Sequence, residues 1–482
     1  MITIDFSKRG NAGLCDFLSN SIRSQISDGH LKADEKLPSK RALSSHLGVS
    51  VITVQNAYEQ LIDEGYIYSI EKKGFFVTDI AVQAVPNDEN APDGAPGDYV
   101  ISASARAPVT LAAPRDRAGK KFFFDFRSNT PNLERFPFSQ WAHVMRRVLK
   151  SGDEKLLQRQ DVNGVYELRA AISRHLSGFR NMNVQPEQIV IGAGTESLYS
   201  MLVQFFGRNK IYGVENPGYH KIASVFQLNG AEVKPVLIDS QGLETSLLNQ
   251  EKIDIIHVSP AHHFPTGRVM PIRRRLELLQ WASETSARFI IEDDYDSEFR
   301  FNGKPLPTLF SGDSSGKVIY VNTFSKTISP SFRISYMVLP AGIAADFHKK
   351  LGSYSCPVSA FEQYTLADFI NEGFYDNHLI RMKNYYRNLR NALIHALTHS
   401  QFARLISIHE EEAGLHFLLS FTTDRSGEDL KAAFEKQELN LPLLKEFYYN
   451  NYEDVSKTFV INYSAVQKDL IPQLIRRMEK VF

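Results

Sequence analysis

The chain has 482 residues, whereas one domain usually takes about 100–200 residues, so two or three folded units are expected. Hydrophobic residues make up 43%, aromatic residues 11% and charged residues 23%, which excludes collagen-like, wholly disordered and disulfide-scaffold proteins. Lys plus Arg and Asp plus Glu both number 55. Because the net charge is zero, any binding to nucleic acid must depend on a local basic patch.

Nothing in the sequence directs the chain across or into a membrane. The first ten residues contain charged side chains and no apolar core of the kind found in a signal peptide. No run reaches the roughly 18 apolar residues of a membrane-spanning helix. The two cysteines, Cys15 and Cys356, match no metal-ligand spacing and fit a reducing compartment. We therefore predict a cytoplasmic protein with no membrane anchor.

The first eighty residues have the pattern of three helices followed by a hairpin. Apolar residues from Leu14 to Ile26 recur at helical spacing. Ser39 and Ser50 can each cap the start of a further helix. Two short apolar runs, residues 66–70 and 75–77, then flank a charged turn that contains glycine. This order predicts a helix-turn-helix with a winged hairpin.

The third of these helices presents polar side chains opposite its apolar stripe. Glutamine and asparagine can each pair with adenine through two hydrogen bonds in the major groove. Basic residues before this helix and at the tip of the hairpin could meet phosphates. The predicted DNA contacts are Lys36, Ser39, Lys40, Arg41, Ser50, Thr53, Gln55, Asn56, Lys72 and Lys73. A protein–protein module is the alternative, but the clustering of basic residues beside the polar face favours DNA.

Residues 11–79 resemble the GntR family of bacterial winged-helix regulators. The resemblance rests on KLPSKRAL at residues 36–43, LGVS at 47–50 and TV at 53–54. The family usually has arginine after the serine of the second motif, where this chain has Val51. The resemblance implies that the third helix reads bases, while the Leu-Pro-Ser segment and the wing hold the DNA backbone.

Residues 80–121 are rich in proline, alanine, aspartate and glycine, which predicts a linker between two folded units. From about residue 122 to residue 482, short apolar strands alternate with helical patterns. Several strands are followed by glycine, proline, serine or acidic residues, at the edge where α/β sheets place ligands. This pattern predicts a large α/β domain with a mainly parallel sheet.

One segment that follows a strand suits an aldehyde cofactor that bears a phosphate. Lys326 could form a Schiff base with the aldehyde. The hydroxyls of Thr323 and Ser325 and the guanidinium of Arg333 could bind the phosphate. A lysine after a serine carries little information alone, so the prediction depends on its neighbours and on the segments described next.

Other segments could complete such a site. Asp293 could pair with a protonated pyridine nitrogen, and Tyr295 could donate to the phenolic oxygen of the ring. Gly194 and Thr195 lie between a strand and a helix, where backbone amides bind anions. Tyr219 could stack on a flat ring. An acidic metal site at the same strand end is the alternative, but no histidine or cysteine set accompanies it, and we predict no metal.

Together these segments resemble the fold-type I aminotransferases over residues 122–482, which implies pyridoxal 5′-phosphate (PLP) as the cofactor. The resemblance implies Lys326 as the Schiff-base lysine, Asp293 at the pyridine nitrogen, Tyr295 at the phenolic oxygen, Tyr219 on the ring, and Gly194, Thr195, Thr323, Ser325 and Arg333 at the phosphate. In SPAHHFPTG, residues 259–267, histidines stand near the family's asparagine that contacts the phenolic oxygen. We expect His263 to take this role, with His262 as the alternative.

The EDDYDSEFR run at residues 292–300 and the FPTGR segment at 264–268 are most similar to the MocR subfamily. Its members fuse a GntR-type winged helix to an aminotransferase-like domain through a linker. The resemblance implies a head-to-tail homodimer, in which each DNA-binding unit packs on the large domain of its partner.

The sequence favours a transcriptional regulator that binds operator DNA and PLP. Its signal would be PLP itself, or an amine or amino acid that forms an aldimine with it. Efficient transamination needs a cation for the substrate carboxylate, commonly arginine, and residues 458–464 contain none. Lys221 could supply a charge but lacks the planar fork of arginine. The alternatives are an aminotransferase with an appended DNA-binding domain, and a cofactor-free dimerisation platform.

Overall fold

The computed structural model describes residues 4, 6–9, 13–70, 72–80, 122–127, 132–301, 306–449 and 457–482. The chain divides into two compact units, residues 1–108 with 271–280 and residues 109–270 with 281–482. Each unit has its own apolar core. The segment predicted as a linker, residues 80–121, lies almost entirely outside the described residues.

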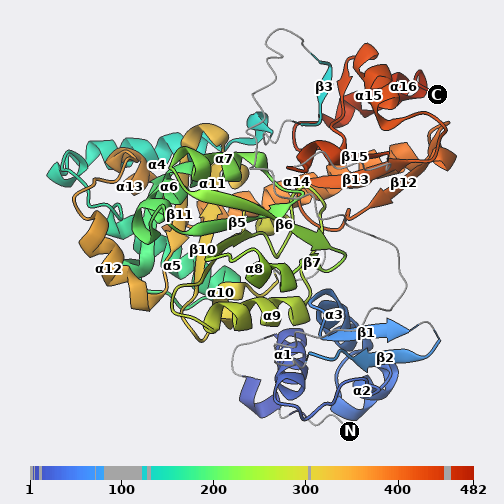
Figure 1. Cartoon of the computed structure of the whole chain (residues 1–482), viewed down its shortest axis with the longest axis horizontal. Helices are drawn as coiled ribbons and strands as arrows, with labels where there is room; N and C mark the ends of the chain where they lie inside the picture. Colours follow the sequence, from blue (N-terminus) through green and yellow to red (C-terminus); the bar gives the residue numbers. More distant parts are fainter. Residues whose placement is uncertain are drawn as a thin grey trace. The chain divides into compact units, whose positions relative to one another are not determined.

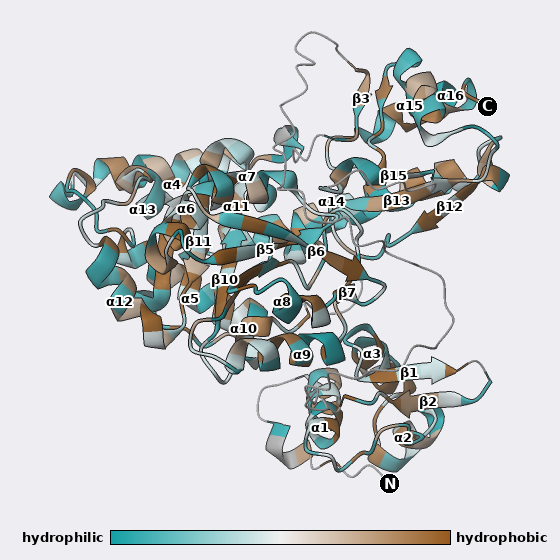
Figure 2. Cartoon of the chain, viewed as in Figure 1, coloured by the Kyte–Doolittle hydropathy of each residue, from teal (hydrophilic) through white to brown (hydrophobic). Residues whose placement is uncertain are grey.

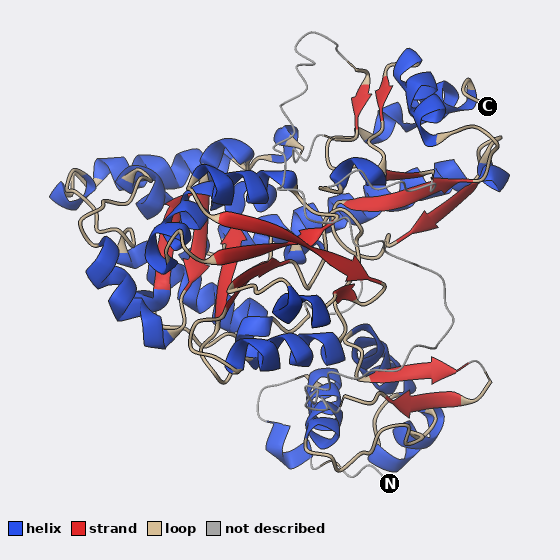
Figure 3. Cartoon of the chain, in the orientation of Figure 1, coloured by secondary structure: helices blue, strands red, loops and turns tan. Residues whose placement is uncertain are grey.

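The smaller unit contains the helices and the hairpin that the sequence predicts (Figure 3). Its helices are α1 (Leu14–Ser27), α2 (Lys40–Leu47) and α3 (Val51–Asp63), and its antiparallel strands are β1 (Ile67–Ile70) and β2 (Gly74–Val77). The hydroxyl of Ser39 accepts a hydrogen bond from the amide of Ala42 at 3.2 Å. The hydroxyl of Ser50 accepts from the amide of Thr53 at 3.0 Å. Both predicted caps are present, and they fix where α2 and α3 begin.

Tyr58 ties the smaller unit together. Its side chain is fully buried in α3 beside Leu61 and Val54. Its hydroxyl donates to the carbonyl of Pro38 at 2.9 Å, and its ring meets the ring of Phe75 edge-on with centroids 4.8 Å apart. One aromatic side chain therefore connects α3 to the segment before α2 and to the hairpin.

An eight-stranded sheet forms the centre of the larger unit (Figure 1). In spatial order its strands are β4 (Ile189–Ala193), β11 (Ile334–Val338), β10 (Val318–Thr323), β9 (Phe289–Asp293), β8 (Ile255–Val258), β5 (Ile211–Asn216), β6 (Glu232–Asp239) and β7 (Gly242–Leu243). β11 and β7 run opposite to the other six strands of this sheet. The predicted α/β domain with a mainly parallel sheet is confirmed.

Helices lie on both sides of this sheet (Figure 1). Its central strands β9 and β10 are correspondingly apolar until their last two residues, which are polar (Figure 2). The helices of the larger unit in this part of the chain are α4 (Phe138–Lys150), α5 (Tyr166–Arg180), α6 (Thr195–Phe206), α7 (His220–Leu228), α8 (Ser246–Gln250), α10 (Leu309–Gly312), α11 (Phe324–Thr327), α12 (Ala341–Leu351) and α13 (Ala360–Asn371), whereas most of α9 (Ile272–Ser283) is grouped with the smaller unit. Among the described residues, no helix has the length and apolar character needed to cross a membrane.

The C-terminal part of the larger unit is built on a second, antiparallel sheet in the order β12–β13–β15. Its elements are β12 (Ile406–His409), β13 (His416–Phe421), β15 (Thr458–Asn462), the parallel pair β3 (Phe124–Asp125) and β14 (Leu439–Asn440), and the helices α14 (Phe374–Thr398), α15 (Gly427–Lys436) and α16 (Ile471–Glu479). Phe417, Phe459 and Leu474 belong to the core that these elements share.

A buried ion pair joins α5 to the end of β9. Arg180 and Asp294 form this pair, and each side chain is only 1% exposed. Asp294 also accepts hydrogen bonds from the hydroxyls of Tyr320 at 2.6 Å and Ser297 at 2.9 Å. Arg180 donates to the carbonyl of Leu306 at 3.1 Å. A buried carboxylate is tolerated only with such partners, so this network fixes the segment that follows β9.

We predict that Arg180→Met lowers the free energy of unfolding of the larger unit by about 3–5 kcal/mol, because it leaves a buried carboxylate without its cation. Urea unfolding of the full chain, followed by tryptophan fluorescence, measures this loss. Arg147→Met is the matched control. Arg147 pairs with Asp368 at 3.1 Å and also with Glu372, and these side chains are 47%, 42% and 36% exposed. Each such pair contributes at most about 1 kcal/mol. Equal losses in the two variants would contradict the role of Arg180.

Candidate functional site

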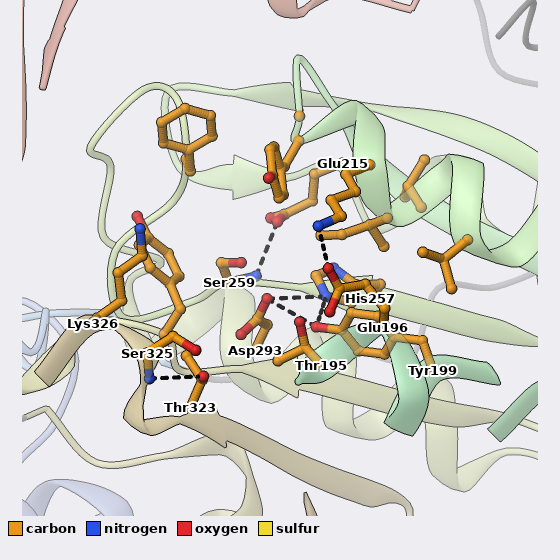
Figure 4. Close-up of a pocket in the computed structure, with 18 of the residues that line it drawn as sticks. Thr195, Glu196, Tyr199, Glu215, His257, Ser259, Asp293, Thr323, Ser325 and Lys326 are labelled. Carbon is orange, nitrogen blue, oxygen red and sulfur yellow. Dashed lines mark hydrogen bonds and ion pairs between the residues drawn. The ribbon is translucent and has the colours of Figure 1, made fainter. Parts of the chain in front are cut away.

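A cavity of about 310 Å³ opens at the carboxyl ends of the central parallel strands of the larger unit. Sheets of this kind present their ligand sites at this edge. Figure 4 shows side chains from β9, β10, α6 and α11 converging on the cavity. The predicted cofactor residues that line it are Thr195, Tyr219, Asp293, Tyr295, Thr323, Ser325, Lys326 and Arg333.

Lys326 lies in α11, directly after β10. Burial lowers the pKa of its amine to about 8, although the nearby carboxylates of Asp296 and Asp293 oppose this shift. The hydroxyl of Thr323 accepts a hydrogen bond from the amide of Ser325 at 3.1 Å, which fixes the turn that presents the lysine (Figure 4). More of this amine is therefore neutral near pH 7 than for an ordinary lysine. A neutral amine is the form that attacks a carbonyl.

Asp293, the last residue of β9, is held from one side only. Its Oδ2 accepts a hydrogen bond from the hydroxyl of Tyr199 at 2.9 Å and lies 3.4 Å from Nε2 of His257. Its Oδ1 is buried and has no hydrogen-bond partner among the described residues. A buried carboxylate oxygen in this position needs a donor, and the cavity is the place from which a ligand can supply one.

Tyr295 contacts a buried cluster of His262, Asp296 and His416. Nδ1 of His262 lies 3.2 Å from the hydroxyl of Tyr295 and 2.9 Å from the carboxylate of Asp296. The rings of His262 and His416 lie 4.5 Å apart, and a side chain at Gly414 would overlap His262. The sequence showed no histidine set beside the acidic run, whereas the fold brings two histidines to Asp296. Ligand-type atoms of the three residues lie within 4.8 Å of one another.

Glu196, in the first turn of α6, forms ion pairs with two basic side chains at the cavity. Its carboxylate pairs with Lys221 and with Arg333. Burial raises the pKa of Glu196, but the hydrogen bonds from Lys221 and Arg333 lower it by more, so the pKa lies below its ordinary value. Arg333 has a φ of 49°, a left-handed conformation that costs about 1–2 kcal/mol for a residue with a side chain. Arg333 thus enters β11 from a strained backbone conformation.

Two residues predicted at the cofactor do not line the cavity. Gly194 precedes α6 with a φ of 83°, and a Cβ there would overlap the guanidinium of Arg333. The ring of His263 is buried, with Nδ1 2.7 Å from the hydroxyl of Thr266. Burial lowers the pKa of His263 to about 3, so its ring is neutral. Phe264, the next residue, lines the cavity instead.

Two family models match the chain. The model of aminotransferase class I and II matches residues 123–476, and that of the bacterial regulatory proteins of the gntR family matches residues 15–77. The HTH-type transcriptional regulator YdeL of Bacillus subtilis is 33% identical over 94% of this chain and 93% of its own length. The probable rhizopine catabolism regulatory protein MocR of Rhizobium meliloti is 32% identical over 96% and 93%. The chain is a MocR-type regulator.

The similarity of this MocR-type regulator to a further relative and to solved structures agrees with this assignment. The pyridoxine biosynthesis transcriptional regulator PdxR of Corynebacterium glutamicum is 28% identical over 89% of this chain and 88% of its own. The structure of LysN, an α-aminoadipate aminotransferase of Thermus thermophilus, superposes with a TM-score of 0.64 at 23% identity, covering 78% of this chain and 95% of its own. The fold-type I aminotransferase fold of the larger unit is thereby shown, and such domains typically bind PLP.

Several of the predicted DNA contacts of the MocR-type regulator are exposed in its smaller unit. Arg41, Gln55 and Asn56 are exposed on α2 and α3. The side-chain amide of Gln55 donates to the carboxylate of Glu59 at 2.8 Å, one turn along α3. Lys72, with a φ of 62°, lies at the tip of the hairpin.

Several residues of the site were missed by sequence reasoning. Tyr199 and His257, which hold Asp293, belong to no motif at recognisable spacing. Glu196, which pairs with Arg333, directly follows Gly194 and Thr195 in the predicted anion-binding turn but was given no role. One signal was available. A buried strand that ends in several acids requires partners for each carboxylate, and this requirement could have directed a search for buried histidines, tyrosines and an arginine.

Proposed function

We propose that this protein is a DNA-binding transcriptional regulator whose large domain binds PLP and responds to PLP or to an amine or amino acid. One observation carries the proposal: the buried amine of Lys326 shares a cavity with Asp293, whose Oδ1 is buried and has no hydrogen-bond partner among the described residues. A protonated pyridine nitrogen is the kind of donor that such an oxygen accepts. The residues present therefore fit the cofactor.

When bound, PLP supplies an aldehyde carbonyl and an electron-accepting ring. Asp293 would hold a proton at the ring nitrogen, while Tyr199 and His257 keep its carboxylate in place from the opposite side. The hydroxyl of Tyr295 would donate to the phenolic oxygen of the ring, and Tyr219 would cover the face of the ring.

The phosphate would bind at the start of α6, where backbone amides and the helix dipole favour an anion. The residues proposed to surround it are Gly194, Thr195, Thr323, Ser325 and Arg333. His263 is not carried into this proposal for the phenolic oxygen, since its ring bonds to Thr266 and Phe264 takes its place at the cavity.

The smaller unit supports operator DNA as the partner. A polar, exposed face of α3 and basic residues around it are the features that base reading and phosphate binding require. We propose a head-to-tail homodimer, which would carry two copies of α3 and read two half-sites. A ligand that favours one arrangement of the dimer would then change how the two half-sites are bound.

A true aminotransferase is the second candidate, and the intact pair of Lys326 and Asp293 favours it. The argument against it is that the described part of the cavity lacks an uncommitted cation to bind the substrate carboxylate. Among the described residues that line the cavity, the cationic ones are Lys221, Lys326 and Arg333, and both Lys221 and Arg333 pair with Glu196. Repeated formation of a keto acid from an amino acid, with turnover, would support the enzyme.

Lys326→Ala should abolish the shifted absorbance band that PLP gives with the wild-type protein, because the variant has no amine to react with the aldehyde. Its affinity for operator DNA without effector should stay close to that of the wild type. Absorbance titration and DNA gel-shift assays measure the two quantities, and Lys349→Ala, an exposed lysine in α12, is the matched control. A folded Lys326→Ala protein without DNA affinity would contradict the division of labour between the units.

The rate at which Lys326 captures PLP should depend on pH. Only the neutral amine attacks, so with a pKa of about 8 the rate should rise about tenfold per pH unit below pH 8 and level off above it. Stopped-flow absorbance measures this rate, with a free lysine derivative as the reference. The reference should keep rising beyond pH 9, and an identical profile for the protein would show that burial does not lower the pKa.

Gln55→Ala should weaken specific binding to operator DNA by about 1–3 kcal/mol and relax the preference at one base pair, if Gln55 bonds to a base through two hydrogen bonds. Lys72→Ala is the comparison. Loss of a phosphate contact should weaken binding to all DNA sequences alike and reduce the slope of log affinity against log salt concentration by about one. Unchanged affinity and sequence preference in Gln55→Ala would remove Gln55 from the base-reading set.

A further inference from the structure

The carboxylate of Glu196 lies beside Arg333, the residue that would neutralise the phosphate in the proposed site. Arg333, the residue proposed to neutralise the phosphate, donates to Oε2 of Glu196, and Lys221 donates to Oε1. Thr195, whose backbone begins α6, is the neighbour of Glu196 in the chain and also lines the cavity. The side chain at position 196 therefore already supplies Arg333 with an anion.

A structural role at the helix start does not account for this arrangement. An acidic residue in the first turn is stabilising because it faces the positive end of the helix dipole, and this requires no cation. Glu196 instead binds two cations from different elements, Lys221 in α7 and Arg333 before β11. Gly194 leaves the space that the guanidinium occupies in this pair, since a Cβ there would meet both Arg333 and Glu196.

We propose that Glu196 competes with the cofactor's phosphate for Arg333, and so lowers the affinity of this domain for phosphate-bearing ligands. This inference rests on the proposed function, because it concerns the same cavity. Phosphate binding would exchange one anion for another: Arg333 leaves Glu196, and Glu196 retains Lys221. Lys221 thereby acts as the cation that keeps Glu196 neutralised beside the bound phosphate.

The exposure of these groups makes such an exchange feasible. The side chains of Arg333 and Lys221 are 49% and 51% exposed, and that of Glu196 is 28% exposed. Ion pairs in contact with water are weak and rearrange at low cost, unlike the buried Arg180–Asp294 pair. The site would then load and release PLP in response to its concentration, which favours PLP itself as the signal.

The test is an equilibrium titration of the full chain with PLP and with pyridoxal, which has the aldehyde but lacks the phosphate. Glu196→Gln should bind PLP about 5-fold more tightly, as expected for removal of one partly exposed ion pair, and pyridoxal as the wild type does. Glu187→Gln, which removes an exposed charge from the same domain, should change neither affinity. Equal or weaker PLP binding by Glu196→Gln, or an equal gain for pyridoxal, would overturn the competition.

Lys221→Met provides a second, independent measurement. It should weaken PLP binding in the wild-type background, where Glu196 loses its remaining cation, and weaken it less in the Glu196→Gln background. An effect at least as large in the second background would show that Lys221 binds the phosphate directly, against the proposal. If the wild type gives no Lys326-dependent band with PLP, the proposed function itself fails. A normal band with no gain in Glu196→Gln overturns the competition alone.

Discussion

The larger unit depends on one constraint: carboxylates gather at the buried end of β9, and each must have a partner. Asp293 contacts Tyr199 and His257. Asp294 pairs with Arg180 and accepts a hydrogen bond from Tyr320. Asp296 pairs with His262. Because an unpartnered buried charge would cost several kcal/mol, these pairings connect β9 to α5, α6, β8 and β10. The strand end that lines the cavity is for this reason held by side chains from several elements of the fold.

The same concentration of charge sets the properties of Lys326. Burial disfavours the ammonium form, while Asp293 and Asp296 favour it, and the resulting pKa of about 8 lies between these limits. The amine is therefore reactive and still close to partners of opposite charge. Oδ1 of Asp293 has no hydrogen-bond partner among the described residues. This unpaired acceptor most directly indicates a ligand with a proton to donate.

The end of the cavity at α6, where we propose that the phosphate binds, has charges in a different environment. The acids at β9 are buried and tightly paired, whereas Glu196, Lys221 and Arg333 are partly exposed. Interactions among exposed charges are weak enough to be exchanged. If the proposed cofactor binds here, its ring would meet a rigid site and its phosphate an exchangeable one. Such a site suits a domain that reports the presence of a cofactor more than one that retains it through many catalytic cycles.

The sequence by itself determined the features that short-range rules govern. Caps at Ser39 and Ser50, the apolar stripe of α3, the hairpin, and the order of Lys326 and Arg333 after a strand are all set by residues within a few turns of one another. Only the tertiary structure decided which distant side chains meet. Packing of the second sheet against the first brings His416 to His262, packing of α5 brings Arg180 to Asp294, and the pairing of β11 with β4 brings Arg333 to Glu196. The turn after β8 places Phe264 at the cavity in place of His263. Pairings of this kind depend on which helices and strands pack together, and no local pattern encodes that.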